Sequence, residues 1–413
     1  MKRTLKLISV AALGAALSLS FSSCEKNTSS SSSDELSANE KALKAAVEEY
    51  VPDVIYEIYG NLADYTEDLY EQVYDMKEDF EAGSLTQATI NKVCATFLNA
   101  RASWESSEAF LYGAATAYGI DPHIDTWPLD KDKLATFLSS ETIISHLEEN
   151  GAGSADEVGV ANLGFHGIEF ILFRDGEPRT VADYSSIEDD EAFANVSVTG
   201  LSELIFAAAV AEDLRNYCWE LQCAWDPDAP ASRVSYVEDE LELNTTLESG
   251  LTYGENLLSA ASLGSTFSSW QRAVSTILVA GCSNICSEVA NSKIASAYNH
   301  TDDDYIESPY SKNSYTDFLN NIYSIQYSLY GSNGASSPSS TCIYNVLKNC
   351  GYSGASDLKS ALEAAITALK NCVNSGVAFV DNPQSEYAGK AITAINELDD
   401  ELNMAADFVE TID

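Results

Sequence analysis

A spacing of three or four positions between apolar residues recurs along most of this chain and constrains the fold more than any other feature. From position 58 to position 80, Ile, Leu, Tyr, Val, Met and Phe residues follow one another at these steps. Such steps match the helical repeat and place the side chains on one helix face. The spacing recurs at 358–373 and 392–409, whereas the alternation typical of a strand is limited to 196–199. The sequence therefore predicts an all-α protein with helices long enough for bundles.

Capping and breaking residues predict where several helices begin and end. Pro52 is expected to start or kink the first long helix, which Gly83 ends, and Ser84 is expected to cap the next one. That second helix is expected to run from about residue 86 to residue 112. Ser356 is expected to cap a later helix. The polar and acidic segment 178–200 is expected to be a long loop.

The segment WDPDAP at 225–230 is the strongest breaker near the middle of the chain and a candidate domain boundary. It predicts two helical-bundle domains of similar length, at 37–228 and 229–413. A Ser-Trp pair occurs within an expected helix of each part, at 103–104 and 269–270. This echo is too weak to establish an internal repeat from the residues themselves.

The first 36 residues predict an export signal and a lipid anchor. Lys2, Arg3 and Lys6 precede an apolar run at 7–19 that is too short to span a membrane. Small residues then stand directly before Cys24, as in the cleavage site of a bacterial lipoprotein. The sequence thus predicts a signal peptide at 1–23, lipidation of Cys24 and a flexible serine-rich tether at 24–36. An ordinary signal peptide with a chance cysteine is the alternative interpretation.

This anchor sets the expected location of the protein. Lipidation at Cys24 would hold it on a membrane of the bacterial cell envelope without spanning that membrane. No later apolar stretch is expected to be long and unbroken enough for a span. The sequence leaves open whether the protein faces the periplasm or lies on the cell surface.

Eight cysteines follow Cys24, and an exported setting permits disulfides among them. Cys342 and Cys350 flank a short segment and are candidates for a pair. Cys282 and Cys286 are one helical turn apart, which is a poor geometry for a bridge. Burial as small apolar side chains is an equally good interpretation for most of these cysteines.

The charge balance excludes one large class of partner. The chain has 22 Lys and Arg residues against 64 Asp and Glu, a net charge of −42. Nucleic-acid binding needs clustered cations, so it is not expected here, whereas cationic ligands and metal ions are suited to this surface. The sequence has four histidines, of which His146 and His300 lie in polar surroundings and are expected at the surface.

His166 and Glu169 form the densest candidate site, because they are the polar side chains of the otherwise apolar stretch 164–173. Three positions apart on a helix, they share a face, and both are ordinary ligands of zinc or iron. A buried histidine satisfied by a neighbouring carboxylate is the plainer interpretation. The spacing is neither HExxH nor HxxEH, and it reverses the ExxH order of di-iron bundles. Any further ligands must therefore come from distant segments.

Two other segments offer carboxylates. Glu105 and Glu108 stand three positions apart near the expected end of a helix, and the aromatic neighbours of Glu108 favour burial over a solvated face. The loop at 121–128 brings Asp121, His123 and Asp125 within five residues. Capping of turns by the two Asp side chains is the alternative interpretation of that loop.

Together these segments resemble the imelysin family, which is classified as peptidase M75. The resemblance runs in order over about residues 40–411 and rests on several motifs. They are the stretch GFHGIE at 164–169, which resembles the GxHxxE motif of the family, and the segments 104–112, 124–130, 281–293 and 308–322.

The resemblance implies an all-helical protein of two related bundles that is exported or lipid-anchored and takes part in iron uptake. It implies a metal site at the GxHxxE motif, where the ligand types suit iron or zinc, and leaves open a free ion, haem or another chelate. By position, the candidate ligands are His166, Glu169 and Glu108, and the residues expected to line a pocket between the two domains are Asp125, Trp127 and Glu288.

The favoured function is a non-enzymatic envelope lipoprotein that binds iron or an iron-bearing ligand between its domains for an envelope iron-uptake partner. The alternative is a metallopeptidase of the M75 type that uses His166 and Glu169. That activity needs a third ligand, an open coordination position and a general base. A structural or adhesive envelope protein, in which the motif braces the domain interface, is a third class.

Overall fold

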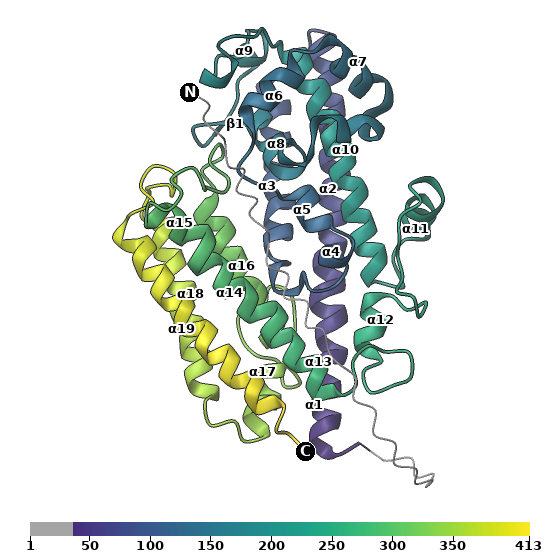
Figure 1. Ribbon diagram of the computed structural model, residues 1–413, viewed down its shortest axis with the longest axis vertical. Helices are drawn as coiled ribbons and strands as arrows, with labels where there is room; N and C mark the ends of the chain where they lie inside the picture. The colour runs from purple at the N-terminus through teal and green to yellow at the C-terminus, as the bar shows by residue number, and fades with distance from the viewer. Residues whose placement is uncertain (1–35) are drawn as a thin grey trace, which may run out of the picture. The chain divides into compact units, whose positions relative to one another are not determined.

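Long helices joined by turns make up the computed structural model, which describes residues 36–413 (Figure 1). The predicted signal peptide, Cys24 and the predicted tether up to residue 35 lie outside the described residues. The elements up to the predicted boundary, with 3-10 and π segments marked η, are α1 (Ala38–Tyr50), η1 (Val51–Tyr56), α2 (Glu57–Glu81), α3 (Gln87–Glu105), η2 (Glu108–Phe110), α4 (Ala114–Ala117), α5 (Ile120–Ile124), α6 (Lys131–Leu138), α7 (Glu141–Asn150), η3 (Gly151–Val158), η4 (Val160–Asn162), α8 (Gly164–Leu172), β1 (Phe173–Arg174), β2 (Glu177–Pro178), α9 (Val181–Tyr184), η5 (Glu191–Phe193) and α10 (Gly200–Trp225).

The elements after the boundary are also helical. They are α11 (Ala231–Ser235), η6 (Tyr236–Glu240), α12 (Tyr253–Leu258), α13 (Trp270–Thr276), η7 (Ile277–Ser283), α14 (Asn284–Glu288), η8 (Val289–Ile294), α15 (Ala295–Tyr298), α16 (Ser314–Tyr330), α17 (Ile343–Asn349), α18 (Ala355–Asn374) and α19 (Glu386–Val409). Within the described residues the sheet structure is limited to the antiparallel pair of β1 with β2 and one isolated bridge. The all-α prediction is confirmed.

Two groups of helices pack side by side. In one, α10 packs along α2 and α2 along α3, and these run from purple to teal in Figure 1. In the other, drawn in green and yellow, α18 packs along α19 and α16, and η7 and η8 pack along α19. The groups meet where α3 contacts α16 and where η2 contacts η7. The contacts join Ser37–Asp413 into one compact unit, and a division into domains at residue 228 stays a prediction.

Several predicted helix ends agree with the structure. Gly83 adopts φ +69° just after α2, a backbone conformation that favours glycine, and α10 ends at Trp225 as the breaker there predicts. Pro52 neither starts nor breaks a helix. It lies in the π segment η1, which carries the chain from α1 directly into α2. A proline inside a continuous helix lacks the amide hydrogen that would bond the preceding turn, and this missing bond coincides with the π segment.

Other predicted ends are wrong. The helix expected to reach residue 112 stops at Glu105, where the Ser107 hydroxyl donates a hydrogen bond to the Trp104 carbonyl at 2.6 Å. Thr86, not Ser84, caps α3, because its hydroxyl accepts from the Thr89 amide at 3.2 Å. Helix α18 starts at 355 after Gly354 rather than after Ser356. The expected loop 178–200 contains α9 and η5, and residues 196–199 contribute the bridge from Ile187 to Thr199 instead of a strand.

The cysteines beyond Cys24 are free thiols, and all but Cys350 are buried. Helix α17 separates Cys342 from Cys350, since the two residues flank its ends. Eight helical steps span about 12 Å, more than the roughly 7 Å limit between Cα atoms for a disulfide. The two residues therefore form no pair in this structure.

One described helical run is long and apolar enough to cross a membrane by length and composition, which differs from the expectation of none. It is Trp270–Tyr298, and 67% of its most apolar window is buried inside the protein. A core helix of a protein outside the membrane passes the same test. The run supplies the core between η2 and α19, with which its π segment η7 packs.

Candidate functional site

Two glycines allow the start of α8 to pack closely, and one of them brings His166 against the segment that carries Asp125. Gly164 has φ +62°, and a Cβ there would lie 1.9 Å from the carbonyl oxygen of Ile124. A Cβ at Gly167 would lie 2.2 Å from the carbonyl oxygen of Asn162. Any larger residue at either position would push the start of α8 away from its neighbours. The glycines of the motif are thus explained by close backbone packing, which places the histidine between them at the site.

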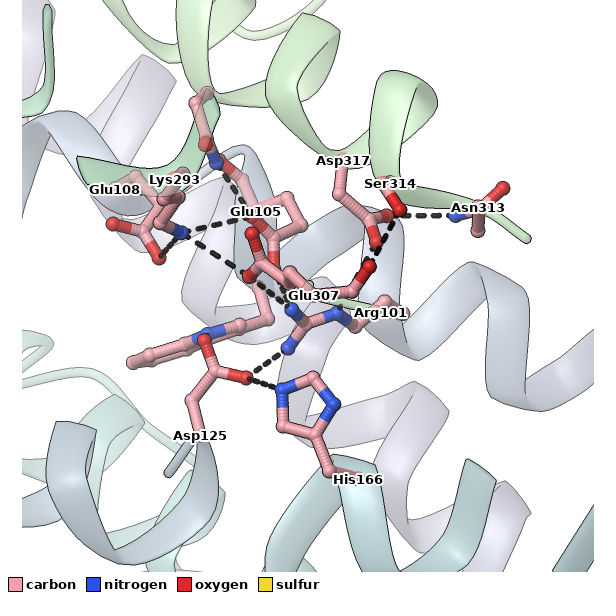
Figure 2. A network of polar contacts seen from close by, with 12 residues as sticks. Arg101, Glu105, Glu108, Asp125, His166, Lys293, Glu307, Asn313, Ser314 and Asp317 are labelled. Atoms are coloured by element: carbon pink, nitrogen blue, oxygen red, sulfur yellow. Dashed lines mark hydrogen bonds and ion pairs between the residues drawn. The ribbon is translucent and has the colours of Figure 1, made fainter. Parts of the chain in front are cut away.

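The imidazole of His166 is 2% exposed and lies between two carboxylates. Its Nε2 is 3.1 Å from Oδ1 of Asp125, and its Nδ1 is 3.6 Å from Oε2 of Glu169 (Figure 2 shows the Asp125 contact). Burial opposes protonation of the ring, but Asp125 and Glu169 outweigh it and raise the pKa of His166 to about 9. The two predicted residues share one face of α8, as their spacing indicated.

Glu169 is held by the segment between α15 and α16. Its Oε1 accepts hydrogen bonds from the Ser311 amide at 2.7 Å and the Ser311 hydroxyl at 2.6 Å. Its Oε2, facing His166 at 3.6 Å, has no hydrogen-bond partner among the described residues. The carboxylate therefore has one fixed oxygen and one oxygen open to a further donor or cation.

Arg101 of α3 lies at the centre of the cluster, as Figure 2 shows, and is 1% exposed. Its Nη2 is 2.6 Å from both Glu105 and Glu307, and its Nη1 forms an ion pair with Asp125. Nε is 3.8 Å from Asp317. Burial alone would raise the pKa of Asp125, but Arg101 and His166 together outweigh it and hold that pKa below its ordinary value.

Lys293 supplies a second buried cation from the π segment η8. Its Nζ is 3.2 Å from Glu307, 3.7 Å from Glu108 and 3.9 Å from Glu105. Burial would favour the neutral amine, but these carboxylates outweigh it and raise the pKa of Lys293 well above its ordinary value. A π segment shifts the register of side chains along a helix, and such segments are frequent at functional sites.

Negative groups outnumber positive ones in this cluster. The carboxylates are Glu105, Glu108, Asp125, Glu169, Glu307 and Asp317, and the cations are Arg101, Lys293 and, when protonated, His166. Burial is the largest cause that raises the pKa of Glu105 and of Asp317 to about 7 and that of Glu108 well above its ordinary value.

The excess of negative groups also leaves carboxylate oxygens without hydrogen bonds. Within residues 36–413, buried carboxylate oxygens without a hydrogen-bond partner include one on each of Glu108, Glu169, Glu307 and Asp317. Such oxygens are costly unless protons or a further cation satisfy them. The cluster is therefore chemically suited to take up positive charge.

Two groups of three residues have ligand atoms within 4.8 Å of one another: Asp125 with His166 and Glu307, and Asp125 with Glu105 and Glu108. Imidazole with carboxylates suits iron or zinc. Of the residues predicted from sequence, His166, Asp125 and Glu108 thus belong to these groups. Glu169 borders the first group, and its role as a ligand stays a prediction.

The remaining predicted residues lie around this cluster. Glu288, at the end of α14, is half-buried and close enough that its charge contributes to the raised pKa of Glu108. His123 turns away and pairs with Asp213 at 2.8 Å. His146 and His300 are exposed, as predicted, and each pairs with a surface carboxylate.

A cavity of about 670 Å³ opens beside His166. His166 lines it together with Trp127, Tyr310 and Ile306, and Asp130 and Asp304 are among its acidic residues. The ring centroid of Trp127 is 6.5 Å from that of His166 and 3.9 Å from that of Tyr305. Small molecules in the cavity can therefore reach the buried cluster through His166.

Arg101, Lys293, Glu307 and Asp317 were not predicted as site residues. They come from α3, η8, the loop before α16 and α16 itself, and Arg101 and Glu307 are 206 positions apart in the sequence. Two of them had a detectable signal, since Lys293 and Asp317 stand inside motifs of the family resemblance.

Comparisons with known proteins agree with this picture. A family model described as Imelysin, Peptidase_M75, matches residues 55–402. Iron-regulated protein A of Synechococcus elongatus is 28% identical over 224 residues, which are 54% of this chain and 47% of that protein. The chain thus spans about half the length of the curated relative that it matches.

Two solved structures share the fold. A candidate iron-regulated protein A precursor from Parabacteroides distasonis superposes with a TM-score of 0.69 at 23% identity, covering 89% of this chain and 95% of that one. An imelysin-like protein from Psychrobacter arcticum superposes with a TM-score of 0.51 at 12% identity, covering 92% and 95%. At these identities the superpositions establish the helical fold and nothing finer.

Proposed function

This chain belongs to the imelysin family, as its motifs predicted, and we propose that it binds iron, as an ion or inside a small ligand, at the cavity beside His166. The name of the Synechococcus elongatus relative, iron-regulated protein A, supports a role related to iron. The bound iron would be kept for uptake by a partner in the cell envelope.

The excess of buried carboxylates around His166 carries this proposal. A structural ion cluster gains most when its charges balance and all its polar atoms are paired. Here buried oxygens of Glu169 and Glu307 lack a partner among the described residues, and His166 opens onto a cavity. A site with this charge is attractive to a cation and reachable from outside.

The residues of the cluster would have different roles in metal binding. His166 is the group that a metal in the cavity would meet, and Asp125 and Glu169 fix the orientation of its ring. Metal binding requires a neutral imidazole, so uptake releases the proton that the two carboxylates favour. Arg101 and Lys293 hold Glu307 in place and limit the negative charge of the empty cluster.

Metal content tests the proposal. The protein is purified without chelator, loaded with iron or zinc, and analysed by mass spectrometry beside the double variant His166→Ala/Glu169→Ala. We expect stoichiometric metal in the wild type and its loss in the double variant. His146→Ala is the matched control, because His146 pairs with Glu157 at 3.1 Å on the surface. Full retention of metal by the double variant would show that the site is elsewhere.

The proposal includes attachment to a membrane through Cys24, which lies outside the described residues. Changing Cys24 to Ser removes the thiol that lipidation requires, so we expect the variant to leave the membrane fraction. Immunoblotting of membrane and soluble fractions measures this. A Cys24→Ser protein that still sediments with membranes would contradict the anchor.

A further inference from the structure

From the proposed function, on which this inference rests, we infer that the iron arrives in a small neutral or cationic chelator with an aromatic ring, and not as a free ion. The argument uses the size of the cavity beside His166, the contacts of the buried carboxylates, and the chemistry of the cavity wall. Each of these points to a ligand that brings its own donor atoms.

The size of the cavity comes first. A volume of about 670 Å³ belongs to the range of small-molecule pockets, roughly 300–1,000 Å³. A water molecule occupies about 30 Å³ in the liquid, so an ion with one hydration shell needs on the order of 200 Å³. The cavity is thus several times larger than a site for a free ion.

The two carboxylates that share a possible ligand group with His166 are already paired with buried cations through at least one oxygen each. Asp125 is paired with Arg101, and Glu307 contacts Arg101 at 2.6 Å and Lys293 at 3.2 Å. The Arg101 guanidinium carries a permanent charge and is 1% exposed. A free metal ion that enters the cluster would therefore compete with a buried cation that cannot move into solvent.

His166 is the member of the two three-residue ligand groups that lines the cavity. Its Nε2 lies 3.1 Å from Asp125 and its Nδ1 lies 3.6 Å from Glu169, so a metal that binds the ring replaces one of these two carboxylate contacts. A metal in the cavity therefore gains one buried protein ligand, and its other positions must be filled by other donors. A chelator fills them and carries the iron out of water at the same time.

The cavity wall combines a flat aromatic surface with negative charge. Trp127 is half-buried and contacts Tyr305 in a tilted arrangement, with ring centroids 3.9 Å apart and planes at 39°. Its ring centroid is 6.5 Å from that of His166, so an aromatic chelator against Trp127 can bring its metal to the imidazole. The charged residues that line the cavity are Asp130, Asp132, Asp303, Asp304 and Lys131. Lys131 is tied to Asp190 at 3.0 Å, so the wall repels anionic carriers such as citrate.

Binding of three iron probes to the full chain tests this inference. They are ferrous aquo ion under anaerobic conditions, ferric citrate as an anionic complex, and a cationic aromatic complex called the bipyridine complex below. The last is the one-to-one complex of ferrous iron with the tetradentate 6,6′-bis(aminomethyl)-2,2′-bipyridine, which leaves two coordination positions open. Equilibrium dialysis measures iron, and iron-free bipyridine is the control. We expect the bipyridine complex to bind at least tenfold more tightly than the aquo ion or the citrate complex.

Substitutions at two residues of the cavity wall test whether the wall causes the preference for the bipyridine complex. Trp127→Ala should weaken binding of the bipyridine complex at least tenfold and that of the aquo ion less than threefold, and Trp127→Phe should restore most of the loss. Asp304→Asn should weaken the cationic complex and leave its iron-free control unchanged. Asp400→Asn, an exposed change on α19, is the matched charge control. Circular dichroism and melting temperature confirm that each variant is folded.

The outcomes separate this inference from the proposed function. Preference for the aquo ion, or citrate binding as tight as bipyridine, would overturn the chelator inference while leaving iron binding intact. A tight bipyridine complex that is insensitive to Trp127→Ala would also overturn it. Failure of all three probes to bind, with the protein folded, would overturn the proposed function itself.

Discussion

Two largely buried ion clusters in this protein differ in the balance of their charges. Around Arg179, two arginines meet two glutamates: Arg179 contacts Glu203 at 2.7 Å and Glu188 at 2.9 Å, and Arg174 contacts Glu188 at 3.0 Å. None of these four side chains is among the buried groups without a partner. The cluster is fully paired and joins the β1–β2 hairpin to α10.

The cluster around Arg101 uses the same residue types and reaches a different result. Its six carboxylates exceed its cations, and unpartnered oxygens remain. It also lies beside the cavity that His166 lines. The comparison teaches that a balanced cluster is a structural device, whereas an unbalanced one beside a cavity has the charge to bind a ligand.

Breaking the balanced cluster should have the largest effect on stability. Arg179→Met leaves Glu203 buried without its cation and Glu188 with Arg174 alone. Removing one partner of a buried ion pair costs about 3–5 kcal/mol. Urea unfolding should show a loss of this size, with iron binding retained at temperatures where the variant is folded. A change below about 1 kcal/mol would contradict the structural role, because that is the range of surface ion pairs.

Neutralising one glutamate in each cluster should shift stability in opposite directions. Glu105→Gln removes an excess charge whose pKa burial raises to about 7, so the free energy of unfolding at pH 8 should rise by about 1–2 kcal/mol. Glu188→Gln removes a carboxylate whose pKa the two arginines, outweighing burial, lower to about 2, so the same quantity should fall by about 1–3 kcal/mol. If both variants changed the free energy of unfolding in the same direction, the two clusters would not differ in charge balance as described.

The pH dependence of stability should identify His166 as a member of the unbalanced cluster. Its pKa is raised to about 9 in the folded protein from about 6.5 in the unfolded chain, so the protonated form favours folding. This contribution is fully present below pH 6.5 and is lost as pH rises to about 9, by about 1–3 kcal/mol. Metal-free wild type should show this loss in urea unfolding and His166→Ala should not. Parallel profiles would contradict the assignment.

The surface pair should show the smallest effect. His146 and Glu157 are 3.1 Å apart, with 45% and 41% of their side chains exposed. Exposed pairs contribute about 0–1 kcal/mol, so His146→Ala should change the unfolding free energy by less than about 0.5 kcal/mol at pH 6. The change should disappear in 1 M salt, where screening is strong. A larger or salt-independent effect would mean that the exposure of an ion pair does not predict its contribution to stability.

The sequence predicted the elements whose signal is local. Long apolar stripes identified α2 and α19, and the composition of 164–169 identified His166 and Glu169 as a pair on one helix face. The end of α3 was missed because it depends on Ser107 and on contacts from α16. Asn321 of α16 donates to Glu105 at 2.5 Å, and residues 216 positions apart carry no shared local pattern.

The candidate site was predicted in part for the same reason. Its histidine and nearby carboxylates stand in recognisable motifs, whereas Arg101 and Glu307 have ordinary helix and loop surroundings in sequence. Their importance comes from the contact between them at 2.6 Å, which tertiary packing creates. The charge excess of the cluster is likewise a property of assembled segments, since the acidic composition of the whole chain does not locate it.

The position of bound iron tests the central claim most directly. Crystals of the full chain loaded with the ferrous bipyridine complex would be measured at the iron absorption edge, and the anomalous signal would locate the metal. We predict a peak in the cavity within coordination distance of a nitrogen of His166, absent from crystals of His166→Ala treated in the same way. An iron peak at another place in the molecule, or one unchanged by His166→Ala, would contradict the account.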